Sequence, residues 1–288
     1  MSDVSLRRVD LEWDGNVLTF TNYEDPTAPT ASYLTKLTGW YGGVGTEGTD
    51  PQRAIHHGQI PTQSRRTGRT LTLGAEMYFA RERDRDIADR FVSGILQDGW
   101  YGDLTYTVNG VATTAQVKLD GEVKHATTGY DYIVLEVPLT APWPYLRGPE
   151  QRTSMSTPNS TIGLRWDQGL FYGGVMDWGE FLPTPLVSNN GNAPAWMKFR
   201  VSGEMDFGFA IDIEGNTIRY PHHVNPGKDV IIDTRTGRVT VDRRDVTHML
   251  SEWEWTPIPP YSTIAPTFTP TSQNAQGYCE IIWNDTYI

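Results

Sequence analysis

The sequence has only one cysteine, Cys279, among 288 residues. A single cysteine excludes a disulfide within the chain, and it excludes the Cys-x-x-Cys pairs of zinc knuckles and thiol oxidoreductases. This cysteine usage fits synthesis in a reducing cytoplasm.

Long hydrophobic runs are also missing. No stretch approaches the ~20 apolar residues that a membrane-spanning helix requires, and the mean hydropathy is -0.46. The first residues, Met1 to Trp13, contain no apolar run after their arginines, so they predict no secretory signal. We therefore expect no insertion into a membrane.

Basic residues are outnumbered: 24 Lys and Arg stand against 35 Asp and Glu, which gives a net charge of -11. A protein that binds nucleic acid normally neutralises phosphates with a basic face. The nearest candidate is the pair Arg65-Arg66 with Arg69, and the run 81–86 alternates in sign. The composition therefore argues against a sequence-specific nucleic-acid partner.

What the sequence has in abundance is the two-residue alternation of β-strands. Val9, Leu11 and Trp13 alternate with polar residues, and Asn109-Gly110 is a strong hairpin signal. Between residues 82 and 99, however, apolar residues recur at helical spacing: Ile87, Phe91 and Ile95. The fold class is therefore predicted as mainly β. We expect an α+β first half, with one helix that ends near Gly99 and packs its apolar face on a sheet.

Prolines divide the chain near its middle. Proline cannot donate to a sheet ladder, so Pro138, Pro142, Pro144 and Pro149 predict the end of one domain and an exposed connector over 142–158. Beyond the connector, short strand patterns follow one another without a helical period, which favours a β-sandwich. The predicted domains are residues 1–146 and 147–288.

Four of the six histidines form two adjacent pairs, His56-His57 and His222-His223. Neighbouring residues of an extended strand point to opposite faces, so each pair offers at most one ligand per side. The usual zinc spacings are absent around both pairs. We expect loop histidines and no metal site.

The motifs of nucleophilic catalysis are missing, and so is the lysine that a phosphate-binding glycine-rich loop requires. We therefore predict no catalytic residues, no cofactor and no enzyme. The glycine-rich segment begins a long loop from Tyr41 to Arg65, and loops of this length are usually functional. The residues that we single out as subunit contacts are Tyr41, Gly43, His56, His57 and Arg65.

Tryptophans gather in the second half: Trp166, Trp178, Trp196, Trp253, Trp255 and Trp283. Exposed tryptophan on a β-sandwich is one way to bind sugar by stacking, for which Trp196, Trp253 and Trp255 are the candidates. Burial is the commoner use of large aromatic residues. A carbohydrate-binding module, or a glycoside-active accessory protein acting at the host cell surface, therefore remains the alternative function.

Several stretches together resemble a known family. They are GRTLTL, the helix that leads into DGWYGDLTY, YDYIVLEVPLTAPWPYLRG, SNNGNAPAWMKFRVSGEM, VIIDTRTGRVT and LSEWEWTPIPPYS. Their order and spacing resemble siphophage distal tail proteins over most of the chain.

The resemblance implies a structural virion protein at the distal end of a bacteriophage tail, made in the host cytoplasm. Residues 1–146 would resemble tail-tube proteins and close a hexameric ring, and residues 147–288 would form an outward-facing, galectin-like sandwich. The implied partners are other copies of the chain, the tail-tube protein, the tail-tip or baseplate hub, receptor-binding proteins for host attachment, and the tape measure.

Overall fold

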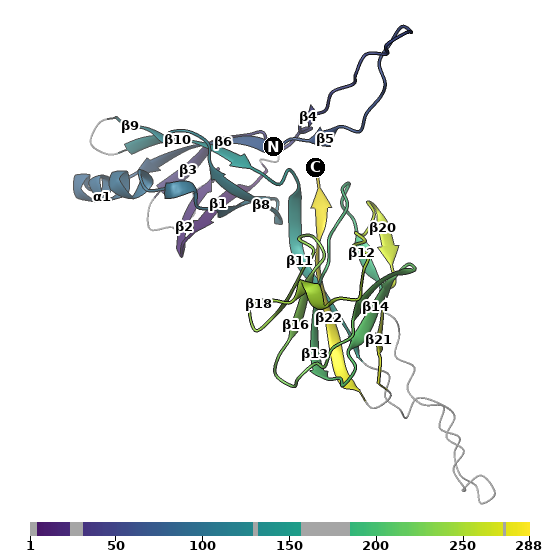
Figure 1. The fold of residues 1–288 in the computed structure, drawn as a ribbon. Helices are drawn as coiled ribbons and strands as arrows, with labels where there is room; N and C mark the ends of the chain where they lie inside the picture. The colour runs from purple at the N-terminus through teal and green to yellow at the C-terminus, as the bar shows by residue number, and fades with distance from the viewer. Residues whose placement is uncertain (1–4, 24–30, 129–131, 157–184, 273–274) are drawn as a thin grey trace, which may run out of the picture. The chain divides into compact units, whose positions relative to one another are not determined.

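The chain is mainly β, as the alternating pattern predicts, and it divides into two compact units, Met1–Gly148 together with Ile288, and Pro149–Tyr287 (Figure 1). This computed structural model describes residues 5–23, 31–128, 132–156, 185–272 and 275–288. Among these residues, none of the helices combines the length and the apolar character needed to cross a membrane.

Among its described residues, the first unit contains ten strands and one α-helix: β1 (Arg7–Trp13), β2 (Asn16–Thr21), β3 (Ala31–Thr38), β4 (Thr46–Glu47), β5 (Arg65–Arg66), β6 (Arg69–Tyr78), α1 (Glu82–Val92), β7 (Gly102–Val108), β8 (Val111–Leu119), β9 (Lys124–Thr128) and β10 (Tyr132–Ala141). A short 3-10 turn covers Gln97–Gly99.

The main sheet of this unit closes on itself. Its strands follow the order β8-β7-β1-β2-β3-β6-β10, and β10 pairs back onto β8 where Leu139 faces Leu119. The predicted hairpins provide its tight turns, because Asp14 and Asn109 both take a positive φ ahead of a glycine. Inward side chains such as Leu11 are fully buried, and each such burial contributes roughly 1.5–3 kcal/mol.

The helix is shorter and less buried than the sequence predicts. It ends at Val92 rather than near Gly99, because the chain turns at Gly94 and carries Ile95 into the core. Glycine is a poor helix former, and the turn that follows buries Ile95 without a longer helix. Moreover, Ile87 is 59% exposed and Phe91 38% exposed. The expectation that core packing explains the whole apolar face was wrong.

The expectation of a connector over 142–158 is wrong for most of the described part of that segment, which is a strand, although several of its residues are exposed. Strand β11 (Leu146–Ser156) occupies most of it and crosses the division between the units. The strand begins after Pro144 but includes Pro149, which is exposed, and the alternating burial of Leu146, Arg147 and Gly148 follows a strand period. Pro158 lies outside the described residues.

The described part of the second unit contains the end of β11 and eleven further strands: β12 (Val187–Asn189), β13 (Lys198–Glu204), β14 (Phe209–Ile213), β15 (Asn216–Tyr220), β16 (Val230–Asp233), β17 (Arg238–Val241), β18 (Arg244–Asp245), β19 (Glu252–Trp253), β20 (Ser262–Ile264), β21 (Thr267–Pro270) and β22 (Gln276–Tyr287). A 3-10 turn covers Thr247–Met249.

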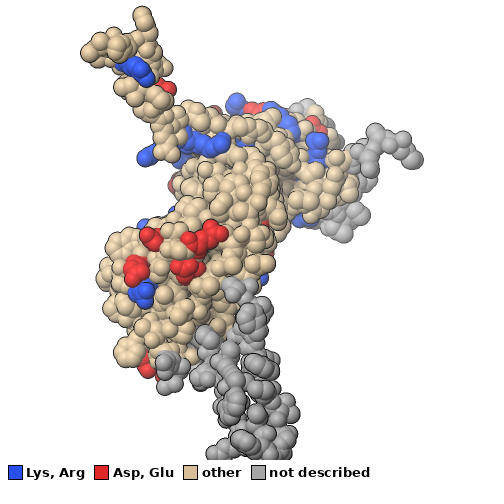
Figure 2. Space-filling view, turned by 90° about the vertical axis from the view of Figure 1, so that its right-hand side faces the viewer, with Lys and Arg blue, Asp and Glu red and all other residues tan. Residues whose placement is uncertain are grey.

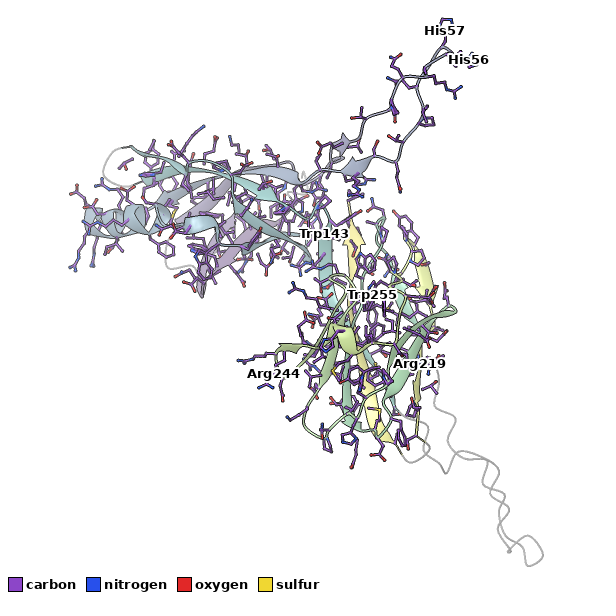
Figure 3. The ribbon with its side chains drawn as sticks, viewed as in Figure 1. His56, His57, Trp143, Arg219, Arg244 and Trp255 are labelled. Carbon is purple, nitrogen blue, oxygen red and sulfur yellow. The ribbon has the colours of Figure 1, made fainter. Side chains whose placement is uncertain are left out.

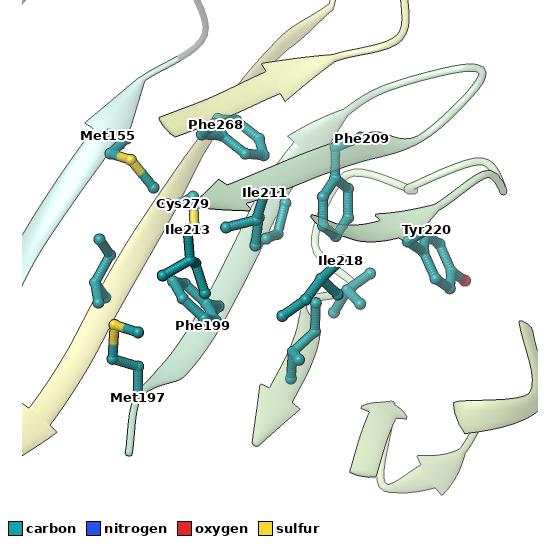
Figure 4. Packing of buried hydrophobic residues seen from close by; sticks show 14 of the residues in the cluster. Met155, Met197, Phe199, Phe209, Ile211, Ile213, Ile218, Tyr220, Phe268 and Cys279 are labelled. Atoms are coloured by element: carbon teal, nitrogen blue, oxygen red, sulfur yellow. The ribbon is translucent and has the colours of Figure 1, made fainter. Parts of the chain in front are cut away.

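Two sheets of this unit share one core. One contains β18-β17-β16-β13-β22-β11 in that order, and the other contains β19-β15-β14-β21. Phe199 and Cys279 from the first sheet meet Ile211, Ile213 and other side chains from the second in a single buried cluster (Figure 4). Alternate residues of each strand point into this cluster, which is the pattern of a sandwich.

Cys279 is part of this core and is completely buried. Burial in apolar surroundings raises the pKa of its thiol well above the ordinary value, because it disfavours the thiolate. We expect the native protein at pH 8 to resist a thiol reagent such as DTNB, and to react with one equivalent after unfolding in guanidinium, because the thiolate is the reactive form. Complete labelling of the native protein within minutes would contradict this packing.

Candidate assembly site

A long hairpin arm, defined here as residues 45–66, extends from the first unit. Its two short strands β4 and β5 pair at the base, where Glu47 faces Arg65. Every residue of the arm is exposed, and His56 and His57 lie at its tip (Figure 3). The predicted contact loop is therefore a structured extension that buries nothing in its own unit.

Local hydrogen bonds give the arm its shape. The Thr62 backbone N–H and hydroxyl donate to the Asp50 carboxylate at 2.8 and 2.9 Å. These two bonds favour the charged form and lower the pKa of Asp50. Nearer the tip, the Ile60 N–H donates to the Pro51 carbonyl and the Arg53 N–H donates to the Gly58 carbonyl. The arm is thus preorganised for contact, which reduces the entropy lost on binding.

A buried arginine holds the root of the arm. The Arg69 guanidinium donates through Nη1 to the Gly39 and Trp40 carbonyls, both at 2.8 Å. Its Nε donates to the Pro144 carbonyl at 3.1 Å. Arg69 is only 3% exposed, so one side chain ties the end of β3 to the segment that precedes β11. Burial lowers the pKa of Arg69, although arginine keeps its charge in proteins.

Aromatic contacts support the same root. Trp40 is buried, its ring meets that of Tyr106 edge-on at 5.7 Å, and its indole N–H donates to the Thr113 hydroxyl at 3.1 Å. Tyr41 is 69% exposed, with its ring 6.0 Å from that of Tyr106. Of the residues named from the sequence, Gly43 and Tyr41 lie at the root, Arg65 at the base of the arm, and the two histidines at its tip.

Neither histidine pair belongs to a cluster of potential metal ligands among the described residues. His223 and His222 follow β15, where His223 lies 3.5 Å from the Asp206 carboxylate and His222 packs against Tyr220. The described residues contain no group of three or more His, Cys, Asp or Glu side chains placed to hold a metal ion.

The three tryptophans proposed for sugar stacking differ in exposure. Trp253 on β19 is 59% exposed, whereas Trp196 is half-buried and Trp255 packs against the core of the second unit. Trp166 and Trp178 lie outside the described residues. Trp253 thus offers one exposed ring at a sheet edge.

Carboxylates gather on one face of the second unit, and basic side chains gather near the base of the arm (Figure 2). Among the carboxylates of this unit, Asp212 lies on β14, Glu252 on β19 and Glu254 directly after β19. Each has a local partner: Glu252 pairs with Arg219 at 2.8 Å, Glu254 accepts from the Thr217 N–H, and Asp212 accepts from the Gly215 N–H. These partners give the carboxylates structural roles within their own sheet.

A buried asparagine anchors the second unit. The Asn189 amide donates to the carbonyls of Ala193, Ile258 and Pro259 at 2.8–3.3 Å. Its oxygen accepts from the backbone N–H groups of Gly191 and Thr286. The sequence motif around this residue contributes to the family resemblance but predicts no role for it. The structure supplies the role, because Asn189 joins segments far apart in the chain.

Comparison with solved structures identifies the class of fold. No protein-family model and no curated protein matches the chain. In contrast, its fold is that of phage hub and baseplate proteins, and the resemblance to distal tail proteins is confirmed at this level.

Two solved structures illustrate the likeness. One is the Dit protein of phage SPP1, described as a paradigm of the hub adsorption apparatus in phages that infect Gram-positive hosts. It has a TM-score of 0.58 and 14% identity, covering 97% of this chain and 99% of that one. The other is a chain of the phage P2 baseplate in its activated conformation with calcium, with a TM-score of 0.50 and 11% identity, covering 97% and 98%.

Proposed function

We propose that the chain is a structural protein of a phage tail tip, located at the distal end of the tail. Its copies form a six-membered ring that joins the tail tube to the hub and to the receptor-binding parts. The observation that carries this proposal is a fold shared with SPP1 Dit over nearly the whole length of both chains. The exposed arm adds a second support, because a preformed extension whose residues are all exposed suits assembly.

In this proposal the first unit closes the ring and contacts the tail tube. The second unit, a galectin-like sandwich, faces outward toward receptor-binding proteins. The protein has no enzymatic role and needs no cofactor. Support comes from the missing catalytic motifs, and from the lack of a metal-binding group among the described residues.

The ring is tested by mass photometry and negative-stain electron microscopy of the purified protein, alone and with its tail-tube protein. We expect ring particles whose mass is six times 32.4 kDa. Removal of residues 46–65 should abolish the rings, because a closed symmetric assembly depends on each of its interfaces, while both units stay folded by circular dichroism. Monomers alone under all conditions, for the intact protein, would overturn the proposal.

One observation keeps the sugar-binding alternative in view, namely the exposure of Trp253. A working sugar site needs polar side chains beside such a ring, and the neighbouring Arg219 is paired with Glu252. Binding of the intact protein to host cell-wall glycans that disappears in Trp253→Ala, with folding unchanged, would establish this function for the second unit.

A further inference from the structure

Apolar side chains gather at the α1 end of the first unit, and four of the five described next are exposed, whereas Trp13 is buried. Ile87 and Phe91 lie one helical turn apart, so they share a face of α1. The Phe91 ring lies 5.5 Å from the ring of Trp13. Trp13 in turn lines an open groove of about 330 Å³ with Val17, which is 55% exposed, and Tyr101, which is 50% exposed. These five residues are called the helix patch.

Acidic side chains border the groove. Glu12, Asp14 and Asp103 line it together with the apolar residues, and all three are exposed. Arg147 binds Asp103 at 3.1 Å. Glu12 and Asp14 form no ion pair with another described residue, so their charges are unbalanced at the groove. A ligand that suits the groove would carry an apolar side chain beside a positive one.

The tip of the arm has this chemistry. Ile55 is 88% exposed and Ile60 is 50% exposed. Arg53, two residues before Ile55, is exposed as well, and its N–H is bonded to Gly58 within the tip. The tip thus presents apolar and basic side chains on a backbone that is already ordered.

The arm, which begins at β4 and β5, and the helix α1 lie at opposite ends of the first unit (Figure 1). The root of the arm packs at Tyr106, toward the end of β7, whereas the groove lies at Gly102, where β7 begins. From the root at Gly45 to Ile55, an extended chain spans about 30 Å. The tip therefore reaches away from the patch of its own copy.

We infer that the tip of the arm docks on the helix patch of a second copy of this chain, with Ile55 in the groove and Arg53 facing Glu12 and Asp14. The tip of the arm and the helix patch are different surfaces, so every copy can bind one neighbour through its arm and another through its helix patch. Contacts of this heterologous kind close into rings when the rotation between copies permits. The inference rests on the proposed self-assembly and adds the residues of the contact.

Disulfide trapping tests the contact directly. Ile55→Cys and Val17→Cys are prepared as separate variants of the full chain and mixed under mild oxidation. We expect covalent dimers at least tenfold above those from Ile55→Cys mixed with Val111→Cys. Val111 is a suitable control because it is 66% exposed and lies outside the patch. Equal yields from both mixtures would overturn the inference. A result in which Val17→Cys forms a disulfide only with an added tail-tube protein, and not with Ile55→Cys, would overturn it as well.

A charge exchange tests the same contact in assembly. Arg53→Glu should raise the concentration for half-assembly at least tenfold, and Glu12→Arg in the same chain should restore it. Arg243→Glu, an exposed arginine of the second unit, should have no effect. Rings unaffected by Arg53→Glu would refute this contact and leave the proposed function intact. If the unmodified protein forms no rings, the proposed function fails, and the trapping yields alone decide on the contact.

Discussion

Asn189→Asp should reduce the free energy of unfolding of the second unit by about 4 kcal/mol at neutral pH. The substitution preserves size and shape but replaces the amide donor with a carboxylate oxygen. That oxygen would face the carbonyls of Ala193, Ile258 and Pro259 at hydrogen-bond distance. Asn189 is 1% exposed, so water cannot screen the repulsion.

The gains and losses caused by Asn189→Asp add up to a destabilisation of the second unit. The remaining oxygen can still accept from the N–H groups of Gly191 and Thr286, which are 3.0 and 3.2 Å away. Those two bonds become charge-assisted and recover part of the loss. They do not offset a buried charge beside three acceptors that have lost their donor. The net loss corresponds to roughly 10–15 °C in the melting temperature of a unit of this size.

Thermal unfolding followed by near-ultraviolet circular dichroism measures the loss. Protonation of the introduced carboxyl group restores a donor to the buried network, so its pKa in the folded state lies above its unfolded value. The penalty is therefore full above the folded-state pKa of that carboxyl group and shrinks as the pH falls through it. Asn225→Asp, at an exposed turn position, is the matched control and should change the melting temperature little. An Asn189→Asp variant as stable as the unmodified protein at neutral pH would contradict the buried network.

Much of the fold could be predicted from the sequence because local patterns encode it. The alternation at Val9, Leu11 and Trp13 reports a half-buried strand, and all three side chains are buried. The turn at Asn109-Gly110 joins β7 to β8, because both residues accept the positive φ that a tight hairpin requires. Features of this kind depend on neighbouring residues in the chain, so they can be predicted without tertiary information.

Features that depend on distant partners were not predictable in the same way. The helix ends at Val92 because Ile95 packs into the core, which no local signal predicts. The alternation does predict the direction of the Arg69 side chain. Arg69 lies two residues before Leu71 on the same strand and therefore points inward as well. Its partners, the carbonyls of Gly39 and Pro144, come from separate parts of the chain and could not be read from sequence.

The candidate site likewise contains one feature that the sequence predicts and one that it does not. The long loop from Tyr41 to Arg65 was identified by its length and glycine content, and the structure gives it the form of an exposed arm. The groove at Trp13 and Tyr101 was missed, because its parts lie on different strands and are brought together only by the closed sheet. In the sequence, the residues of an exposed apolar patch show no periodic pattern that distinguishes them from buried apolar residues.

Gly39→Ala should destabilise the first unit by about 3 kcal/mol and loosen the root of the arm. Gly39 has a φ of 80°, a conformation that alanine adopts only with strain. A Cβ atom there would lie 2.1 Å from the Thr70 carbonyl oxygen, which belongs to the backbone of β6. The strand cannot shift without moving Arg69, whose guanidinium binds the Gly39 carbonyl. The strain therefore spreads to the clamp that holds the arm.

Gly43→Ala is the matched control, since a Cβ atom at Gly43 meets nothing within 4 Å. It should be neutral or stabilising by up to about 1 kcal/mol, because alanine restricts the unfolded chain. Thermal unfolding measures the global effect, and amide hydrogen exchange at Thr67, whose N–H donates to the Gly45 carbonyl, measures the local one. Faster exchange at Thr67 in Gly39→Ala but not in Gly43→Ala ties the arm to its buried root. Equal behaviour of the two variants would mean that the arm is held by its own strand pair alone.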